Sequence, residues 1–409
     1  MRYACAIDFG TTNSVVALAR EGEPKPQVVA SEPSCILITD DRSTQRLYAG
    51  NDAIAHYRGA ADTTRFVKSM KSLLSDPGFQ STRVFGRTYT AAHLVRPVLS
   101  HLKALAEGAL GERIHRVILG RPVHFSAAWE HDDLAEGRLR EAAVLAGFTE
   151  ITFQKEPIAA GWSFASTLQE ERRVLVADLG GGTADFCLVV FRPDGRHQVL
   201  AVGGARIGGD DFDGRIMWGR LISSFGYGST YESWGKMLEV PIHIYRALCR
   251  WDRIPFLKES RTWRDLRYIH QGSTDKPGIA RLMALIRNDL GFPLYQRIAA
   301  AKHELSRAVV STIRMDQDEV TLREELSRAQ FESMIAADVD QILGTASETL
   351  TTAGMKSTDV DICFLTGGCS LVPVVASRFA RLFPGGRLST EGDAFTSVAS
   401  GLAIYGLTA

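Results

Sequence analysis

The fold of this chain is indicated by one motif that occurs twice, as Asp8-Phe9-Gly10-Thr11-Thr12-Asn13-Ser14 and as Asp178-Leu179-Gly180-Gly181-Gly182-Thr183-Ala184-Asp185. Each copy starts with an acid that ends an apolar run (residues 3–8 and 173–178), and a second apolar run follows (residues 15–19 and 186–191). This pattern predicts two strands joined by a Gly/Thr turn. The copies lie about 170 residues apart, which is too far for a solenoid repeat. The sequence therefore predicts two copies of one α/β domain.

The same motif predicts a phosphate site. Glycine lets backbone N–H groups approach a phosphate chain with no Cβ in the way, and threonine and serine hydroxyls add donors. A strand-end carboxylate would repel the phosphates unless a cation lies between them, and Mg²⁺ reached through water meets that requirement. One Gly/Thr turn is more often an ordinary tight turn. Two matched turns, each preceded by an acid, predict a nucleoside triphosphate with a divalent metal in a cleft between two similar lobes.

Other segments fit an α/β chain. Residues 91–108 carry apolar side chains at helical spacing, and residues 132–146 are predicted to form a helix that stops at Gly147. Buried strands are predicted at 117–120 and 361–368, and a further helix is predicted from about Val372.

Composition and charge exclude several classes of protein. The chain has 409 residues, 45% of them hydrophobic, which is enough for more than one core. Lys plus Arg and Asp plus Glu both number 47, so the balance does not support a basic nucleic-acid footprint. No apolar run approaches the roughly 20 residues that cross a bilayer, and no signal-peptide core precedes Asp8. The six cysteines are scattered without a Cys-x-x-Cys, so we expect free thiols in a reducing cytoplasm rather than a zinc site or disulfides.

Residues 212–300 differ in amino-acid composition from the rest of the chain. They hold four of the six tryptophans and many arginines, and we expect a mostly helical subdomain. A helical cap with core tryptophans and solvated arginines is the plainer interpretation. A surface for a partner or a peptide is the alternative.

The paired motifs resemble the two phosphate motifs of the actin-like ATPase superfamily, which includes actins, sugar kinases and the seventy-kilodalton heat-shock chaperones of the DnaK type. The resemblance is closest to the DnaK type. Residues 156–160 (Glu-Pro-Ile-Ala-Ala) resemble its hinge segment, and residues 207–213 (Ile-Gly-Gly-Asp-Asp-Phe-Asp) resemble a signature that actins and sugar kinases lack. Residues 367–373 (Gly-Gly-Cys-Ser-Leu-Val-Pro) are similar to its adenosine motif. The resemblance spans nearly the whole chain and is weakest at 212–295.

The resemblance implies roles for individual residues. Asp8 and Asp178 would hold Mg²⁺ through water, and with Lys71, Glu156 and Thr183 they would form the catalytic set. The implied cofactors are ATP or ADP and Mg²⁺. The residues implied in nucleotide binding are Gly10, Thr11, Thr12, Asn13, Gly180, Gly181, Gly182, Thr183, Gly208, Gly209, Lys302, His303, Ser306, Gly367, Gly368, Leu371 and Asp393.

Two of the catalytic assignments have alternatives. Lys71 resembles the lysine that reaches the γ-phosphate and the attacking water, where a cation stabilises the transferring phosphoryl group. Lys68 is a nearby rival, and by residue pattern alone either lysine would be a solvated helix residue. Glu156 would help to position the water, or would serve only as a carboxylate at a helix N-terminus.

The segment that contacts the base departs from the family pattern. Residues 302–306 (Lys-His-Glu-Leu-Ser) resemble the family's Lys-Arg-x-Leu-Ser segment. This chain retains Lys302 and Ser306, which the resemblance implies for the ribose. His303 replaces an arginine, Ala299 a glutamate and Leu371 a second arginine. Leucine packs on a purine but cannot stack as a guanidinium does. We therefore expect nucleotide binding with weaker or altered base selection, with His303 either against the base or a plain helix residue.

The implied fold class is α/β, with two actin-like (ribonuclease-H-like) lobes and the nucleotide cleft between them. Each lobe would have a core mixed sheet and an appended subdomain. The first lobe would span residues 1–172, with its core at 1–32 and 107–172 and its appended subdomain at 33–106. The second would span 173–409, with its core at 173–211 and 308–389, a helical Trp- and Arg-rich subdomain at 212–307, and a C-terminal segment, 390–409, packing back toward the first lobe.

The end of the chain shapes the functional expectation. Only three residues follow Gly406, where a DnaK-type chaperone continues into a linker, a peptide-binding β-sandwich and a helical lid. The layout resembles short bacterial relatives of the YegD type. It implies a cytoplasmic, chaperone-like ATPase that slowly hydrolyses ATP to ADP and phosphate with Mg²⁺ and lacks the peptide-binding domain.

Two alternatives to this function stay open. One is a nucleotide-dependent sensor or scaffold with negligible turnover, and the other is a small-molecule kinase of the same superfamily. The expected partners are nucleotide and a protein partner or client, with no nucleic acid and no membrane.

Overall fold

The computed structural model describes residues 2–41, 44–57, 63–125, 131–165, 169–193, 196–258, 260–385, 387–389 and 396–408. The chain divides into two compact units. Unit 1 comprises the described residues up to 208 and those from 339 onward, and unit 2 comprises those from 209 to 338. Among the described residues, no helix combines the length and the apolar character needed to cross a membrane.

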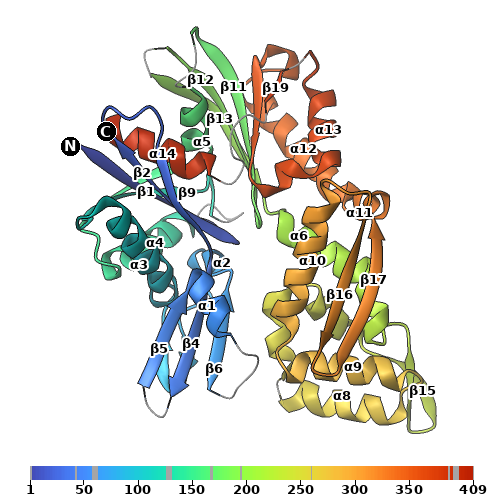
Figure 1. The fold of residues 1–409 in the computed structure, drawn as a ribbon. Coiled ribbons are helices and arrows are strands. Elements are labelled where there is room, and N and C mark those ends of the chain that lie inside the picture. The colour runs from blue at the N-terminus through green and yellow to red at the C-terminus, as the bar shows by residue number, and fades with distance from the viewer. Residues whose placement is uncertain are drawn as a thin grey trace. The chain divides into compact units, whose positions relative to one another are not determined.

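Two five-stranded sheets with the same strand order form the centre of unit 1 (Figure 1). The first has the order β10-β9-β1-β2-β3 and the second the order β19-β18-β11-β12-β13. In each sheet the central strand pairs in parallel with one neighbour, β9 or β18, and antiparallel with the other, β2 or β12. The predicted repeat of an α/β unit is therefore confirmed. The strands are β1 (Tyr3–Phe9), β2 (Asn13–Arg20), β3 (Gln27–Pro33), β9 (Arg116–Arg121) and β10 (Glu150–Lys155) in the first sheet, and β11 (Arg172–Leu179), β12 (Ala184–Phe191), β13 (His197–Ala205), β18 (Ile362–Thr366) and β19 (Leu388–Ser389) in the second.

The central strands are buried on both faces, which is why they occur in the sequence as nearly continuous apolar runs. In β1, Cys5 and Ile7 belong to the core with α3 (Ala91–Leu110) and α4 (Asp132–Leu145). Ala4 and Ala6 belong to a second core on the opposite face. Because successive side chains alternate between faces, Asp8 shares the face of Ala4 and Ala6.

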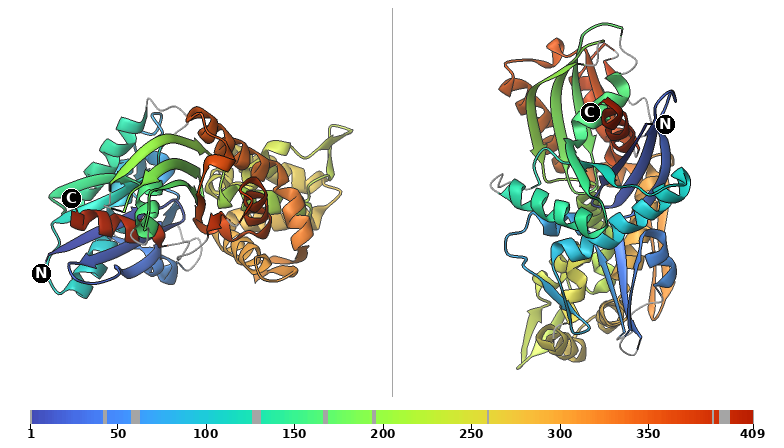
Figure 2. Two further views of the ribbon diagram at one scale, coloured as in Figure 1. Left: turned by 90° about the horizontal axis from the view of Figure 1, so that it is seen from above. Right: turned by 90° about the vertical axis from the view of Figure 1, so that its left-hand side faces the viewer.

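The second core joins the two sheets through two helices, α5 (Glu156–Ala165) and α14 (Ser397–Thr408). α14 packs on β1, β2 and β9, α5 packs on β11 and β12, and the two helices pack on each other. Figures 1 and 2 show α14, in red, against the blue strands β1 and β2. The helices approach closely because Gly401 has no side chain, since a Cβ there would lie 1.6 Å from the Ala159 carbonyl oxygen. Asp8, Asp178 and Asp185 occupy alternating positions on this inner face, so both sheets direct acids toward the same space.

Smaller elements complete unit 1. A three-stranded sheet of order β5-β4-β6 leads into α2, which packs on α3 and α4. The predicted helix at 91–108 corresponds to α3, the one at 132–146 to α4, and the one from about Val372 to α13, so all three are confirmed. The bounds are β4 (Cys35–Asp41), β5 (Thr44–Ala49), α1 (Gly50–His56), β6 (Thr64–Lys68), α2 (Lys71–Leu74), β7 (Thr82–Val84), β8 (Arg87–Tyr89), α12 (Ala336–Thr352, beginning in unit 2), the 3-10 helices η5 (Ser357–Asp359) and η6 (Gly368–Leu371), and α13 (Pro373–Leu382).

Unit 2 is mostly helical and contains two β-hairpins. The hairpin β16–β17 lies in residues 308–338, which the sequence analysis grouped with the core of the second lobe. The hairpin β14–β15 presents Trp234 at its turn, 94% exposed, so this tryptophan is not a core residue. The bounds are α6 (Gly209–Ile216), the π-helix η2 (Met217–Leu221), the 3-10 helices η3 (Ile222–Phe225) and η4 (Trp251–Lys258), β14 (Thr230–Ser233), β15 (Lys236–Glu239), α7 (Ile242–Leu248), α8 (Ser260–Gly272), α9 (Lys276–Arg287), α10 (Gly291–Leu305), β16 (Val310–Gln317), β17 (Val320–Ser327) and α11 (Arg328–Met334).

Candidate functional site

The two Gly/Thr turns of unit 1 lie against each other. Gly182 faces Thr11 so closely that a Cβ on the glycine would lie 3.2 Å from the threonine Oγ1. Within the second turn, the Gly180 N–H donates to the Thr183 carbonyl at 2.9 Å. In the first, the Thr12 carbonyl accepts from the Ser34 N–H at 2.8 Å. The structure thus brings together the two stretches that the sequence singled out, Gly10 to Asn13 and Gly180 to Thr183.

Lys71 and Glu156 form an ion pair beside these turns. Lys71 is the first residue of α2 and Glu156 the first of α5, and the Lys71 Nζ lies 2.7 Å from the Glu156 Oε1. Their side chains are 12% and 7% exposed. Burial lowers the pKa of Lys71, but the carboxylates of Glu156 and Asp8 outweigh it and leave the pKa raised, so the amine stays charged at neutral pH. Lys68, the rival considered from the sequence, instead ends β6 opposite Cys35 of β4.

Three acids share this site, and all three hold their protons unusually well. Burial, and after it the charge of Glu156, raises the pKa of Asp8 well above its ordinary value. The same two causes raise the pKa of Asp178 to about 8 and that of Asp185 to about 7. Asp8 and Asp178 keep some solvent exposure, whereas Asp185 is 3% exposed. If all four carboxyl groups were ionised, one lysine could not balance their negative charge, and this repulsion contributes to the retention of the protons.

This donor set fits a divalent cation. Repulsion among the carboxylates is what a cation between Asp8 and Asp178 would relieve, and Mg²⁺ binds through few carboxylates while keeping several waters. In the part of the chain that the structure describes, no three His, Cys, Asp or Glu side chains are grouped closely enough to hold a metal ion by themselves.

A glycine pair forms one wall of the second turn. Gly367 has a φ of 79°, and a Cβ there would lie 2.4 Å from the Leu179 carbonyl oxygen and 2.8 Å from Asp178 Oδ1. No other residue could occupy that place without moving the acid. Gly368 then begins η6, which ends at Leu371, a side chain that is 42% exposed. Gly208 lies against the backbone of Gly180 and Gly181.

The remaining nucleotide-binding candidates lie in unit 2 or outside the described residues. The Lys302 Nζ donates to the Gly209 carbonyl at 2.7 Å and lies 2.7 Å from Asp213 Oδ1, so it ties α10 to α6. His303 is an exposed residue, and partial desolvation of its ring lowers its pKa, with Lys302 and Arg307 adding to the effect. Ser306 is the C-cap of α10. Asp393 lies outside the described residues.

Asp185 is the functional candidate that sequence reasoning left out of the site. It pairs across the strands with Asp178, while its carboxylate accepts hydrogen bonds from Thr183 and from the Val123 N–H. The signal was available, because Asp185 closes the second motif two residues after Thr183 and shares the inner face of β12 with Cys187 and Val189.

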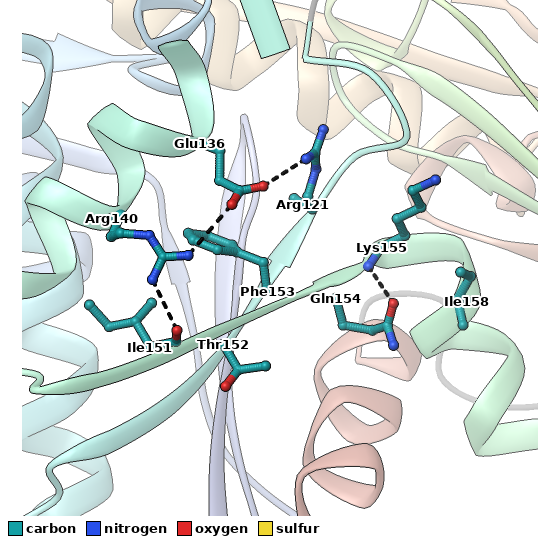
Figure 3. A pocket seen from close by; sticks show the side chains of 9 residues that line it. All are labelled: Arg121, Glu136, Arg140, Ile151, Thr152, Phe153, Gln154, Lys155 and Ile158. Carbon is teal, nitrogen blue, oxygen red and sulfur yellow. Dashed lines mark hydrogen bonds and ion pairs between the residues drawn. The ribbon is translucent and has the colours of Figure 1, made fainter. Parts of the chain in front are cut away.

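A separate hollow of about 530 Å³ lies beside α4 and β10 (Figure 3). Arg121, Arg140 and Glu136 converge on it, with a lining that includes none of the site acids. Glu136 accepts from Arg121 Nη1 at 2.7 Å, and Arg140 Nη1 donates to the Ile151 carbonyl at 3.1 Å.

Two sheets of identical strand order with acid-lined Gly/Thr turns define a nucleotide-binding protein of the actin-like ATPase class. A family model described as Hsp70 protein matches residues 55–227 and 292–407, which is more than half of the chain. The chain therefore belongs to the Hsp70 family, and the resemblance seen in its motifs is confirmed. At family level it is an ATP-binding, chaperone-like ATPase, since members bind ATP or ADP with Mg²⁺ and act on client proteins. Residues 228–291, with the hairpin β14–β15 and helices α7 to α9, fall outside the matched ranges.

Proposed function

We propose that this chain binds Mg²⁺–ATP at the paired turns of unit 1 and slowly hydrolyses it to ADP and phosphate. The observation that supports this proposal best is the Lys71–Glu156 ion pair, 2.7 Å long, beside Asp8 and Asp178. It combines a charged amine for a transferring phosphoryl group with a carboxylate that can orient a water.

Each residue has a separate task in this proposal. The Lys71 ammonium stabilises charge that develops on the γ-phosphoryl oxygens, and Glu156 accepts a hydrogen bond from the attacking water. Asp8 and Asp178 hold the water shell of Mg²⁺, which supplies positive charge to the phosphates when it is bound. Backbone N–H groups of the two turns, with the Thr11 and Thr183 hydroxyls, bind the phosphate oxygens.

Leu371 and His303 are both exposed, which supports weak base selection. We expect calorimetry to give ATP and GTP affinities within about tenfold of each other, a difference of roughly 1.4 kcal/mol. The six cysteines are all free and five are buried, which supports a reducing cytoplasm. We propose that a protein partner or client responds to the bound nucleotide.

The function is tested by phosphate release from ATP with the wild type and with Lys71→Ala. Loss of a cation that stabilises the transition state lowers turnover by about 10²–10³-fold. Lys68→Ala is the matched control, with turnover within about twofold of the wild type, because Lys68 ends strand β6 whereas Lys71 forms the ion pair with Glu156. Wild-type turnover in Lys71→Ala would contradict the catalytic assignment.

The alternatives separate in the same assay. Phosphate release that requires an added acceptor would indicate a small-molecule kinase. Tight nucleotide binding with no release would indicate a sensor or scaffold.

A further inference from the structure

Arg138 of α4 binds the short segment that carries Lys71. Its guanidinium donates to four backbone carbonyls of this segment, all at hydrogen-bond distance. These are Leu73 at 2.9 Å, Leu74 at 3.0 Å and Asp76 at 2.8 Å from Nη1, and Phe79 at 2.7 Å from Nη2.

The segment needs such support because α2 is only four residues long. A single helical turn is unstable in isolation, and its carbonyls have no partners within the helix. At its N-terminal end, Met70 provides no side-chain cap and Ser69 adopts a left-handed backbone with a φ of 54°. Leu74 anchors the turn in the core, being fully buried. At the C-terminal end, Ser75 Oγ donates to the Ser72 carbonyl at 3.5 Å. Further polar contacts come from Arg138, whose planar fork can serve several acceptors at once.

The hydrogen bonds from Arg138 lie close in the chain to the catalytic amine of Lys71. Lys71 is the first residue of α2, and the Leu73 and Leu74 carbonyls that accept from Arg138 belong to the same helical turn. A rotation or shift of this turn therefore moves the Lys71 amine relative to Glu156, which is held separately at the start of α5. A displacement of about 1 Å at a catalytic group can lower a rate by about 100-fold.

We propose that Arg138 is a positioning residue for ATP hydrolysis, which acts by fixing α2 so that the Lys71 amine meets the γ-phosphate. This inference rests on the proposed function. Because Arg138 bonds the backbone carbonyls of Leu73, Leu74, Asp76 and Phe79, its contribution passes through Lys71. It should therefore change the turnover number, and leave the Michaelis constant for ATP unchanged.

The first test compares Arg138→Ala with Arg140→Ala. Arg138→Ala should lower kcat by about 100-fold, with KM for ATP within about twofold, and Arg138→Lys should lower kcat by about tenfold, because an ammonium cannot span the four carbonyls. Arg140 lies two residues further along α4, and its guanidinium bonds the Ile151 carbonyl and pairs with Glu136 instead (Figure 3). Arg140→Ala should keep kcat within about twofold. Should Arg138→Ala fail to fold, Arg138→Lys carries the same test.

A double-mutant cycle with Lys71→Ala separates positioning from a merely structural role. If Arg138 acts through Lys71, Arg138→Ala should change the residual turnover of Lys71→Ala by less than about twofold. The full loss of about 100-fold in the Lys71→Ala background would overturn the inference, as would wild-type kcat in Arg138→Ala.

Failure of the inference differs from failure of the proposed function. Wild-type turnover in Lys71→Ala, or no turnover in the wild type, would overturn the proposed function and with it a role for Arg138 in that reaction. An inactive Lys71→Ala with a fully active Arg138→Ala would overturn the inference alone. Amide hydrogen exchange gives a readout independent of turnover, since Arg138→Ala should accelerate exchange across residues 72–79 and leave β1 protected.

Discussion

The two central hairpins of unit 1, β1–β2 and β11–β12, have the same architecture but different chemistry at one position. In the second hairpin, Asp178 pairs across the strands with Asp185. In the first, Asp8 occupies the corresponding place and pairs with Val15. The second hairpin thus carries two acids on its inner face and the first carries one.

The difference shows how a repeated fold acquires an asymmetric site. Next to Asp178 a second carboxylate raises local charge, and the pKa values of about 8 and about 7 reflect burial combined with repulsion from Glu156. The Lys71 amine, whose charge is stabilised by Glu156 and then by Asp8, comes from the smaller elements that follow the first sheet. Geometry is shared by the two copies, whereas the reactive groups are distributed unequally between them.

The largest expected effect comes from neutralising either strand-end acid. Asp8→Asn and Asp178→Asn keep side-chain shape but remove a carboxylate from the proposed Mg²⁺ water shell, so each should lower phosphate release by about 100-fold. Asp41→Asn, an exposed acid at the end of β4, is the control and should keep wild-type turnover. Full activity in Asp8→Asn or in Asp178→Asn would contradict the proposal that both strand-end acids are needed for hydrolysis.

Placing an acid in the first hairpin should damage the fold. Val15 is 2% exposed and lies opposite Asp8, so Val15→Asp buries a polar group beside a like charge. We expect a loss of about 3 kcal/mol in the free energy of unfolding, measured by urea titration, against about 1 kcal/mol for Val15→Thr. If Val15→Asp and Val15→Thr lost the same free energy of unfolding, charge would not be the reason that the first hairpin carries a single acid.

Removing an acid from the second hairpin should have the smallest effect and should depend on pH. The folded chain retains the Asp185 proton up to about pH 7, whereas an unfolded chain releases it near pH 4. Its contribution to stability is therefore present below pH 4 and is lost as pH rises through 7. Asp185→Asn should raise Tm at pH 8 by about 2–4 °C without metal, and by less at pH 5.

The control for this measurement is the addition of Mg²⁺. The cation should reduce the difference in Tm between Asp185→Asn and the wild type at pH 8, because it relieves repulsion among the carboxylates. A gain in Tm that is the same at both pH values would show that Asp185 acts through packing rather than charge.

The sheets and their turns were predictable because their signals are local. Strands buried on both faces leave continuous apolar runs, and the Gly/Thr turns leave a motif at each strand end. The register that pairs Asp8 with Val15 then follows from a short turn. Asp185 could have been assigned to the site in the same way, because it is the last residue of the second motif.

The contacts that complete the site could not be derived from residue pattern. Lys71 and Glu156 are 85 residues apart, and resemblance indicated each of them but not their ion pair. A helix of four residues leaves no periodic signal, so a helical position was considered for Lys71 but the bounds of α2 were not predicted. Arg138 leaves none either, because it binds backbone carbonyls, which every residue possesses. The hairpin β14–β15 was missed because tryptophan at a turn resembles a core residue in composition.

The position of α14 has a consequence for biosynthesis. β1 and β2 leave the ribosome long before α14, the helix that begins at Ser397 and covers their inner face. At about 5–20 residues per second, that face waits roughly 20 s or longer for its cover to be translated. The nascent first sheet therefore exposes an apolar surface until α14 is translated, and a member of a chaperone family is itself a chain whose strands β1 and β2 mature only after translation of a helix far along the sequence.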